Sequence, residues 1–227
     1  MAFIISLLIH HLSWGMQPTI FTWEDSSSQV HSTLRGTLPE NNWYAEDFKM
    51  EDLLFHQSLC NNQTVMGCYG DGQVRTPEST LKRVEPWAER FEKGQPHGGM
   101  TVFQLENKAP IGFIVAGVGD GAGVSEVAYA YMPEVWGKGI GNNVVEKIVT
   151  EWAPEVRRIG LNNVNFQCFG GKVLERLDAT ASPSNPASWK ILVKNNFHRA
   201  ISGTSGERLV IEVDRDKCHN LGKIDYK

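Results

Sequence analysis

Three glycines within a five-residue stretch constrain this chain more than any other feature. The turn that holds them reads Trp-Gly-Lys-Gly-Ile-Gly at residues 136–141. The segment before it, residues 125–132, has the pattern of an extended strand. After it, apolar residues recur at helical spacing until Pro154. The pattern therefore predicts a strand, a tight turn, and then a helix over residues 142–153.

Such a turn is suited to binding an anion. The first amides of a helix have no partner within the helix and point outward. The helix dipole adds about half a positive charge at the same place. Glycine lets a bulky anion approach the backbone, so Gly137, Gly139 and Gly141 favour a bound phosphate group. The alternative is a simple strand-to-helix connector, for which three glycines would cost needless conformational entropy.

Two other phosphate motifs fit less well. Residues 117–122 partly match the dinucleotide pattern G-x-G-x-x-A, but a strand follows them instead of a helix, which favours a hairpin turn. The pattern G-x-x-x-x-G-K-S/T of nucleoside-triphosphate sites does not occur in the chain. We therefore do not expect a triphosphate held through magnesium.

Composition excludes several function classes. The 227 residues carry a formal net charge of −4, so a basic face for nucleic acid is not expected. The four cysteines form no Cys-x-x-Cys pair and have no histidine cluster beside them, so we expect free thiols in a reducing, cytoplasmic compartment and no metal. They are Cys60, Cys68, Cys168 and Cys218.

The N-terminal segment carries a short apolar run at residues 3–12. That run is too short for a membrane span, which needs about 20 apolar residues. It also lacks the basic start of a secretory signal, so we expect neither a membrane partner nor export. Met16 is an alternative start of translation, in which case residues 1–15 are an artefact of the sequence. We expect residues 1–29 to be an extension and residues 30–227 to form one domain.

The order of the expected elements predicts a mixed α/β fold, with a mostly antiparallel sheet and helices on both faces. The expected strands are 30–38, 100–106, 111–118, 124–132, 174–181, 197–202 and 208–214. The expected helices are 45–59, 76–93, 142–153 and 186–195. Pro86 should kink or divide the second of these helices, and the stripe from Leu81 to Phe91 should be buried.

The glycine turn resembles the main motif of the GNAT superfamily of acyl-CoA N-acyltransferases, Gln/Arg-x-x-Gly-x-Gly/Ala. Here it stands as Trp136-x-x-Gly139-x-Gly141. Tryptophan at the first position, within Pro-Glu-x-Trp-Gly-Lys-Gly, is similar to the branch of ribosomal-protein alanine/serine N-acetyltransferases. Residues 185–197 resemble the family's Asn-x-x-Ser … Lys-x-Gly-Phe helix, with Asn196 where glycine is usual. The likeness covers roughly residues 30–215 and implies the GNAT fold.

The resemblance implies where acetyl-CoA binds, in a gap between the fourth and fifth strands of the family fold. The turn amides would bind the pyrophosphate, and they belong to Gly137, Lys138, Gly139, Ile140, Gly141 and Asn142. The Lys138 side chain either touches phosphate or faces solvent. The backbone of Ala130, Tyr131 and Met132 would pair with the pantetheine arm. Asn185 would cap its helix and secondarily contact the cofactor or a water.

Two residues are candidates for proton transfer. The branch often has glutamate at the position of Glu126, which would accept a proton from the amine, directly or through water. The alternative is a solvent-facing strand residue paired with a cation. Many family members use a helix tyrosine as general acid, but Leu192 occupies that place here. The branch offers Ser188 instead, whose alternative is a local bond in the first turn of the helix.

We therefore expect an N-acetyltransferase that uses acetyl-CoA and a primary amine. The amine is either a protein N-terminus, with a pKa of about 7.7–8.0, or a small molecule, and it attacks the thioester directly. The competing hypothesis is a catalytically silent module that binds acyl-CoA as a sensor or scaffold. A weaker alternative is an unrelated α/β protein that binds phosphate. The sequence leaves open whether the protein is a monomer or a homodimer.

Overall fold

The computed structural model describes residues 20–24, 29–38, 41–182, 185–200 and 207–213. Within these ranges the strands form one nine-stranded sheet in the order β1-β2-β3-β4-β5-β6-β7-β9-β8. Each neighbouring pair is antiparallel except β6 with β7, which is parallel. The strands are β1 Ile20–Glu24, β2 Gln29–Gly36, β3 Trp43–Asp47, β4 Gly98–Gln104, β5 Pro110–Val118, β6 Val124–Tyr131, β7 Arg176–Ala181, β8 His198–Arg199 and β9 Glu207–Glu212.

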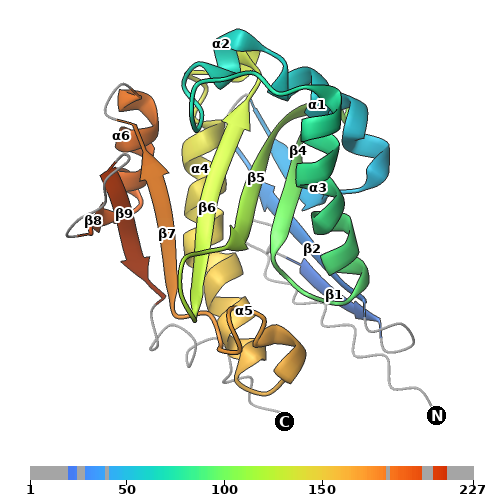
Figure 1. Ribbon diagram of the computed structural model, residues 1–227, viewed down its shortest axis with the longest axis vertical. Coiled ribbons are helices and arrows are strands. Elements are labelled where there is room, and N and C mark those ends of the chain that lie inside the picture. The colour runs from blue at the N-terminus through green and yellow to red at the C-terminus, as the bar shows by residue number, and fades with distance from the viewer. Residues whose placement is uncertain (1–19, 25–28, 39–40, 183–184, 201–206, 214–227) are drawn as a thin grey trace.

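Helices cover both faces of the sheet, as the sequence predicts. In Figure 1, α1 and α3 lie in front of the sheet and α4 lies behind it. One apolar cluster, which includes Trp87 and Phe113, lies on the α1–α3 face. A second, which includes Val144 and Trp152, lies on the α4 face. The helices are α1 Leu53–Cys60, α2 Gln63–Met66, α3 Pro77–Glu92, α4 Ile140–Lys147, α5 Ala153–Gly160 and α6 Pro186–Lys194.

The parallel strands β6 and β7 separate soon after they begin. They pair at three positions, of which the last joins Glu126 to Asp178. Beyond that pair β6 continues to Tyr131 and β7 to Ala181 without pairing to each other. Figure 1 shows the two strands diverging toward the end of the sheet at which α2 and α6 lie. A gap therefore opens within the sheet.

The expectation of a helix from residue 45 is wrong over its first part. Residues 43–47 form β3, where buried and half-buried side chains alternate, and β3 pairs with β4. This period of two is that of a strand with one face in the core. A short 3-10 turn at Met50–Asp52 follows, and only then does α1 begin. The strand β1 is also an addition to the prediction, because residues 17–29 carry no clear strand pattern.

The helix after the glycine turn does not end at Pro154. A single π-helical segment, Ile148–Trp152, follows α4 and leads directly into α5. Its closing bond runs from the Ala153 N–H to the carbonyl of Ile148. Pro154 then falls in the first turn of α5, where a missing N–H is tolerated. The wider π-helical turn thus allows the helix to continue through Pro154, where the sequence pattern predicts its end.

The other elements follow the prediction closely. The two hairpins β4–β5 and β5–β6 use the expected connectors, and residues 117–122 belong to the second hairpin. Pro86 lies inside α3 without dividing it, and the buried stripe of α3 includes Val84, Trp87 and Phe91. Leu81 and Ala88 are only partly buried. The alternative start at Met16 lies outside the described residues, and the division at residue 29 remains a prediction.

Candidate functional site

The edge of β6 that faces the gap offers unpaired backbone groups. The Met132 N–H donates to the carbonyl of Ile111 at 2.9 Å, and the Gly119 N–H donates to that of Val124 at 3.0 Å. Because hydrogen-bonded pairs alternate along an antiparallel ladder, the even-numbered residues of β6 turn their backbone groups toward β5. Residues 127 and 129 turn theirs toward the side of β7, and the ladder with β7 ends at the pair of Glu126 with Asp178. The backbone groups beyond that pair are the carbonyl of Val127 and both groups of Tyr129.

This geometry narrows the backbone stretch that was expected to pair with pantetheine. Met132 and Ala130 face β5 with their backbone groups. The carbonyl of Tyr131 accepts a hydrogen bond of 2.8 Å from the indole Nε1 of Trp136. Of the three predicted residues, Tyr131 is the one whose N–H points into the gap. Trp136 therefore has a local structural role, since its hydrogen bond joins the end of β6 to the start of the glycine turn.

The three glycines of the turn meet different physical requirements. Gly137 and Gly139 adopt left-handed backbone conformations, with φ of 74° and 82°. A Cβ on Gly137 would meet no described atom within 4 Å, and one on Gly139 would meet only Leu38 Cδ1 at 3.9 Å. A Cβ on Gly141 would instead lie 3.2 Å from the ring of Tyr131. The first two glycines shape an open concavity, whereas the third allows close packing.

Gly139 is the N-cap of α4. Because glycine has no side chain, no side-chain hydrogen bond caps the first amides of the helix. Lys138 is exposed, and the buried Ile140 side chain anchors the turn to the core. The Asn142 side chain accepts a hydrogen bond of 3.3 Å from Asn195, the C-cap of α6. The start of α4 is thus joined to the C-terminal end of α6, and the first amides of α4 have no partner within the helix.

A second set of polar contacts lies at the N-terminus of α6. The Asn185 side chain caps this helix by accepting from the Ser188 N–H at 3.0 Å, and it donates to the carbonyl of Cys68 at 2.8 Å. The hydroxyls of Ser188 and Tyr129 are 2.9 Å apart. Burial raises the pKa of Tyr129 to about 12, against the opposing effect of the Ser188 hydrogen bond. Tyr129 therefore stays protonated at neutral pH.

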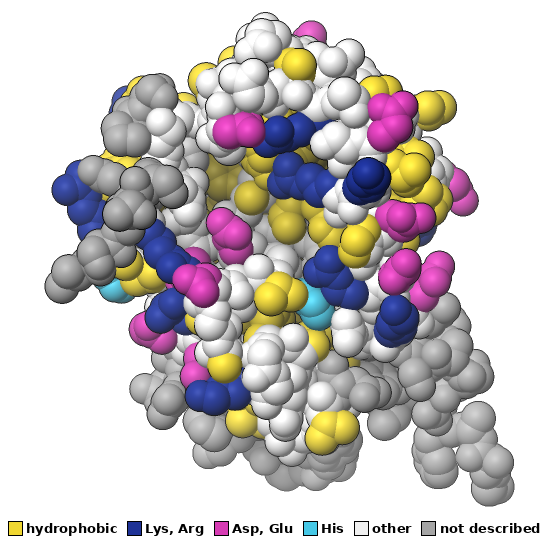
Figure 2. All heavy atoms as spheres, in the orientation of Figure 1, with side chains coloured by type: hydrophobic (Ala, Val, Ile, Leu, Met, Phe, Trp, Pro, Cys, Tyr) yellow, Lys and Arg dark blue, Asp and Glu magenta, His cyan; other side chains and the backbone are white. Residues whose placement is uncertain are grey.

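One cavity of about 920 Å³ lies at the gap, and side chains from both faces of the sheet line it. Its lining on the α3 face includes Glu126, Arg83 and Trp87, and its lining on the other side includes Tyr129 and Ser188. Figure 2 shows a hollow on the α3 face with an apolar floor and basic side chains at its rim. The two candidate catalytic residues, Glu126 and Ser188, thus line the same space. Leu192, at the place of the family's helix tyrosine, lines it as well.

Several cavity residues were not predicted from the sequence. Tyr69, Arg83 and Arg90 come from α3 and from the segment before it, and they carry no motif. Tyr129 likewise carries no motif that would assign it a role. Packing brings these side chains together, and no spacing in the sequence signals it.

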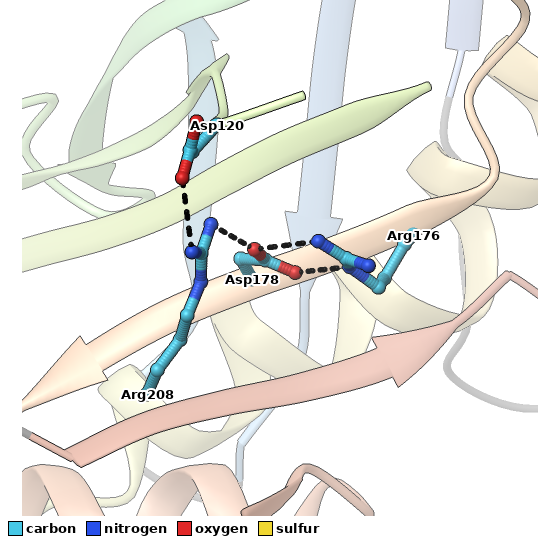
Figure 3. A network of polar contacts seen from close by, with 4 residues as sticks. All are labelled: Asp120, Arg176, Asp178 and Arg208. Atoms are coloured by element: carbon cyan, nitrogen blue, oxygen red, sulfur yellow. Dashed lines mark hydrogen bonds and ion pairs between the residues drawn. The ribbon is translucent and has the colours of Figure 1, made fainter. Parts of the chain in front are cut away.

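An ionic network fixes the point at which β6 and β7 part (Figure 3). Asp178 is 2% exposed and accepts from Arg176 Nε at 2.6 Å and from Arg208 Nη2 at 2.5 Å. Arg208 also contacts Asp120 in the β5–β6 connector at 3.2 Å. These contacts tie β7 to β9 and to the hairpin beside Glu126. The sequence assigned no role to Asp178, and the structure gives it a structural one.

The comparison with protein families decides the identity of the fold. A family model described as an acetyltransferase (GNAT) domain matches residues 44–198. This chain belongs to the GNAT acetyltransferase family. The resemblance seen in the glycine turn is thereby confirmed, as is the mixed α/β fold. Comparison with curated proteins gives no significant match.

Solved GNAT structures share the fold at low sequence identity. The ribosomal-protein-S5-alanine acetyltransferase of Vibrio fischeri has a TM-score of 0.59 and 16% identity, covering 80% of this chain and 98% of that one. RimJ of Mycobacterium smegmatis, solved with CoA-disulfide, has a TM-score of 0.54 and 16% identity, covering 83% of this chain and 92% of that one. Spermidine N-acetyltransferase of Vibrio cholerae, solved with CoA and spermine, has a TM-score of 0.53 and 16% identity, covering 75% of this chain and 95% of that one.

Within the described ranges, no helix combines the length and apolar character needed to cross a bilayer. In the same part of the chain, His, Cys, Asp and Glu side chains form no group of three that could hold a metal ion. The three cysteines in that part, Cys60, Cys68 and Cys168, are unpaired.

Proposed function

We propose that this GNAT protein is an acetyl-CoA-dependent N-acetyltransferase that moves the acetyl group to a primary amine in the cytoplasm. The observation that carries the proposal is the cavity at the gap between β6 and β7, which side chains from both faces of the sheet line. Such a cavity can bring a thioester that lies along the gap into contact with an amine bound on the α3 side. A protein that only held a phosphate at the glycine turn would have no use for it.

The cofactor would lie along the gap. Amides from Gly137 to Asn142 would bind the pyrophosphate, helped by the open space above Gly137 and Gly139. Hydrogen bonds to a charged group contribute about 1.5–3 kcal/mol each, so a few amides suffice. The pantetheine arm would pair with the carbonyl of Val127 and the backbone groups of Tyr129, as an added strand would, and reach the N–H of Tyr131.

The reaction would be direct attack of the amine on the thioester carbonyl. Glu126 lines the α3 side of the cavity and would take a proton from the ammonium, directly or through a water, to free the nitrogen lone pair. The C–N bond then forms, and the C–S bond breaks as the tetrahedral intermediate collapses. The sulfur leaves as CoA thiolate, which accepts a proton to become the thiol.

On the other side of the gap, we assign Tyr129 and Ser188 to the departing sulfur as a pair. Tyr129 keeps its proton at neutral pH and can donate it, or a hydrogen bond, to the thiolate. Ser188, 2.9 Å away, orients the phenol. In this arrangement Tyr129 on β6 substitutes for the helix tyrosine whose position is taken by Leu192. Ser188 thus acts through Tyr129 instead of alone.

A thiol-release assay tests the proposal. The protein, acetyl-CoA and a panel of peptides and small amines are mixed, and free CoA is measured together with the acetylated product. We expect release that depends on an amine and saturates with it. The absence of the helix tyrosine favours a second candidate, a silent acyl-CoA-binding module. Tight CoA binding in calorimetry with no release on any amine would support that module and contradict the enzyme.

A further inference from the structure

Two arginines on α3 face the same cavity as Glu126. Arg83 and Arg90 both line it, and they are seven residues apart in one helix. Two helical turns separate them by about 10 Å along the axis and keep them on one face. The helix α4, whose first amides belong to the glycine turn, packs on the opposite face of the sheet from α3. The two arginines are therefore placed for the acceptor side of the cavity and not for the pyrophosphate.

Arg83 is held rigidly by aromatic side chains. Its guanidinium carbon lies 5.1 Å from the ring centre of Tyr69 and 5.9 Å from those of Trp87 and Phe113. Its Nη2 also donates a hydrogen bond to the hydroxyl of Tyr69. Arginine stacked on rings in this way loses little further freedom when it binds a ligand. Its remaining N–H groups are available to the cavity.

Arg90 lies two helical turns further along α3 and is held by its own helix. Its Nε donates to the carbonyl of Pro86 at 2.9 Å, one helical turn back. Burial lowers the pKa of its guanidinium from the ordinary value, which marks a cation that is partly out of water. Its two terminal nitrogens make no hydrogen bond or ion pair with the described residues, and Arg90 lines the cavity.

Neither arginine has a carboxylate within 4.0 Å among the described residues, which distinguishes Arg83 and Arg90 from other arginines near the gap. Arg75, also on the cavity wall, is paired with Asp71 at 2.7 Å, and Arg176 is paired with Asp178. A partly buried cation without a counterion is costly, and an anion that binds beside it recovers that cost. The planar fork of arginine matches a carboxylate through two parallel hydrogen bonds.

We propose that the amine acceptor carries a carboxylate, which Arg83 and Arg90 bind while the amine faces Glu126. This inference rests on the proposed acetyltransferase function and adds the class of its substrate. A polyamine would place several positive charges against three arginines with Glu126 as the counterion in the cavity, which the charges disfavour. The carboxylate belongs to a small amino acid or to an acidic residue near a peptide N-terminus.

The test compares amines that differ in one charge. The small pair is 4-aminobutanoate and 4-amino-1-butanol. The peptide pair is Ala-Glu-Ala amide and Ala-Gln-Ala amide. For the full-length protein we expect kcat/KM to favour the acidic member of at least one pair by about 10- to 100-fold. The pair that shows the preference identifies the source of the carboxylate.

Variants assign the preference to the two arginines. Arg83→Gln and Arg90→Gln should each lower kcat/KM for the acidic acceptor by about tenfold or more, with less than a threefold change for its neutral partner. Lys82→Gln is the matched control, because Lys82 is an exposed cation on the same helix that does not line the cavity. Arg83→Lys keeps the charge without the fork and should give an intermediate loss if Arg83→Gln folds poorly.

The outcomes separate this inference from the function beneath it. Equal rates for acidic and neutral amines, or faster acetylation of 1,4-diaminobutane than of 4-aminobutanoate, would overturn the inference and leave the acetyltransferase intact. A preference that survives in both glutamine variants would also overturn it. No thiol release with any amine would overturn the proposed function and the inference with it. CoA affinity measured by calorimetry should be unchanged in Arg83→Gln and Arg90→Gln.

Discussion

At the scale of single residues, Glu126 and Tyr129 divide the chemistry between the two sides of the gap. They lie three positions apart on β6, so their side chains point to opposite faces of the sheet. Glu126 meets the cavity on the α3 side, whereas Tyr129 reaches Ser188 on α6. A proton acceptor on one face and a proton donor on the other suit an amine and a thiol that approach from opposite sides.

Replacing Glu126 by glutamine tests the proton acceptor. Glu126→Gln keeps the size and polarity of the side chain but cannot take a proton. We expect kcat at neutral pH to fall by about 10²–10⁴, measured by CoA release. Because the proton on the amine is the obstacle, activity should recover partly as pH rises toward the amine pKa. A near-native rate at pH 7 would remove Glu126 from the mechanism.

Replacing Tyr129 by phenylalanine tests the donor. Tyr129→Phe should lower kcat by about 10- to 100-fold, because one hydrogen bond to a charged sulfur is lost. Tyr44→Phe is a suitable control, since Tyr44 stacks on Phe103 at the β3–β4 pair and does not line the cavity. Equal activity of the two variants would assign Tyr129 a purely structural role.

At the scale of secondary structure, the sequence predicted best those elements whose cause is local. The glycine turn and the hairpins β4–β5 and β5–β6 depend on residues next to each other in the chain. The strand β3 was missed because its alternation spans only five residues and runs into the helical pattern of α1. The passage through Pro154 was missed because a π-helical segment depends on packing around Trp152 as much as on sequence.

The glycine turn yields a prediction about cofactor binding. Gly139→Val places a β-branched side chain in the open space over the turn, at a φ of 82°. We expect CoA binding to fall below detection in calorimetry. Gly171→Val is the matched control, because Gly171 has a φ of 78° with open space around it and lies away from the turn. Both variants should lose about 1–2 kcal/mol of stability from the left-handed backbone. Retained CoA affinity in Gly139→Val would refute the pyrophosphate site.

The packing of α1 on the sheet predicts how stability depends on pH. His56 of α1 is fully buried, and its Nε2 lies 3.0 Å from Thr101 Oγ1 of β4. Burial, with Arg83 as a smaller cause, lowers the pKa of His56 to about 4 from 6.5. The unfolded chain therefore binds this proton more readily. The stability that the neutral imidazole contributes is complete above pH 6.5 and is lost as pH falls through about 4.

Urea denaturation at pH 7, 6 and 5 measures this effect. The free energy of unfolding should decrease as the pH is lowered from 7 to 5, with about 2 kcal/mol of the decrease attributable to His56. His56→Gln should be less stable at pH 7 but should show a shallower decline. His198→Gln, at an exposed histidine, should keep the slope of the parent. Identical slopes in the parent and in His56→Gln would mean that other groups control the acid limb.

At the scale of the whole molecule, the candidate site is a product of topology. The sheet carries one parallel pair, and that pair comes apart beside the Asp178 network. The family resemblance predicted the gap, but the residues that line the cavity come from the loop before α3 and from α3, β5, β6, β7 and α6, among others. Tyr129 and Ser188 are 59 positions apart, and Arg83 reaches the site from a different helix. No pattern within one segment could have joined them, so the acceptor side emerged only from the fold.

The cavity at the gap also has a kinetic consequence. Its lining comes from both faces of the sheet, so acetyl-CoA and the amine would be held together when the acetyl group moves. Double-reciprocal plots of initial rate against amine, taken at several fixed concentrations of acetyl-CoA, should then intersect. Parallel lines would instead require the acetyl group to rest on the protein after CoA departs, which a cavity that holds both substrates makes unnecessary.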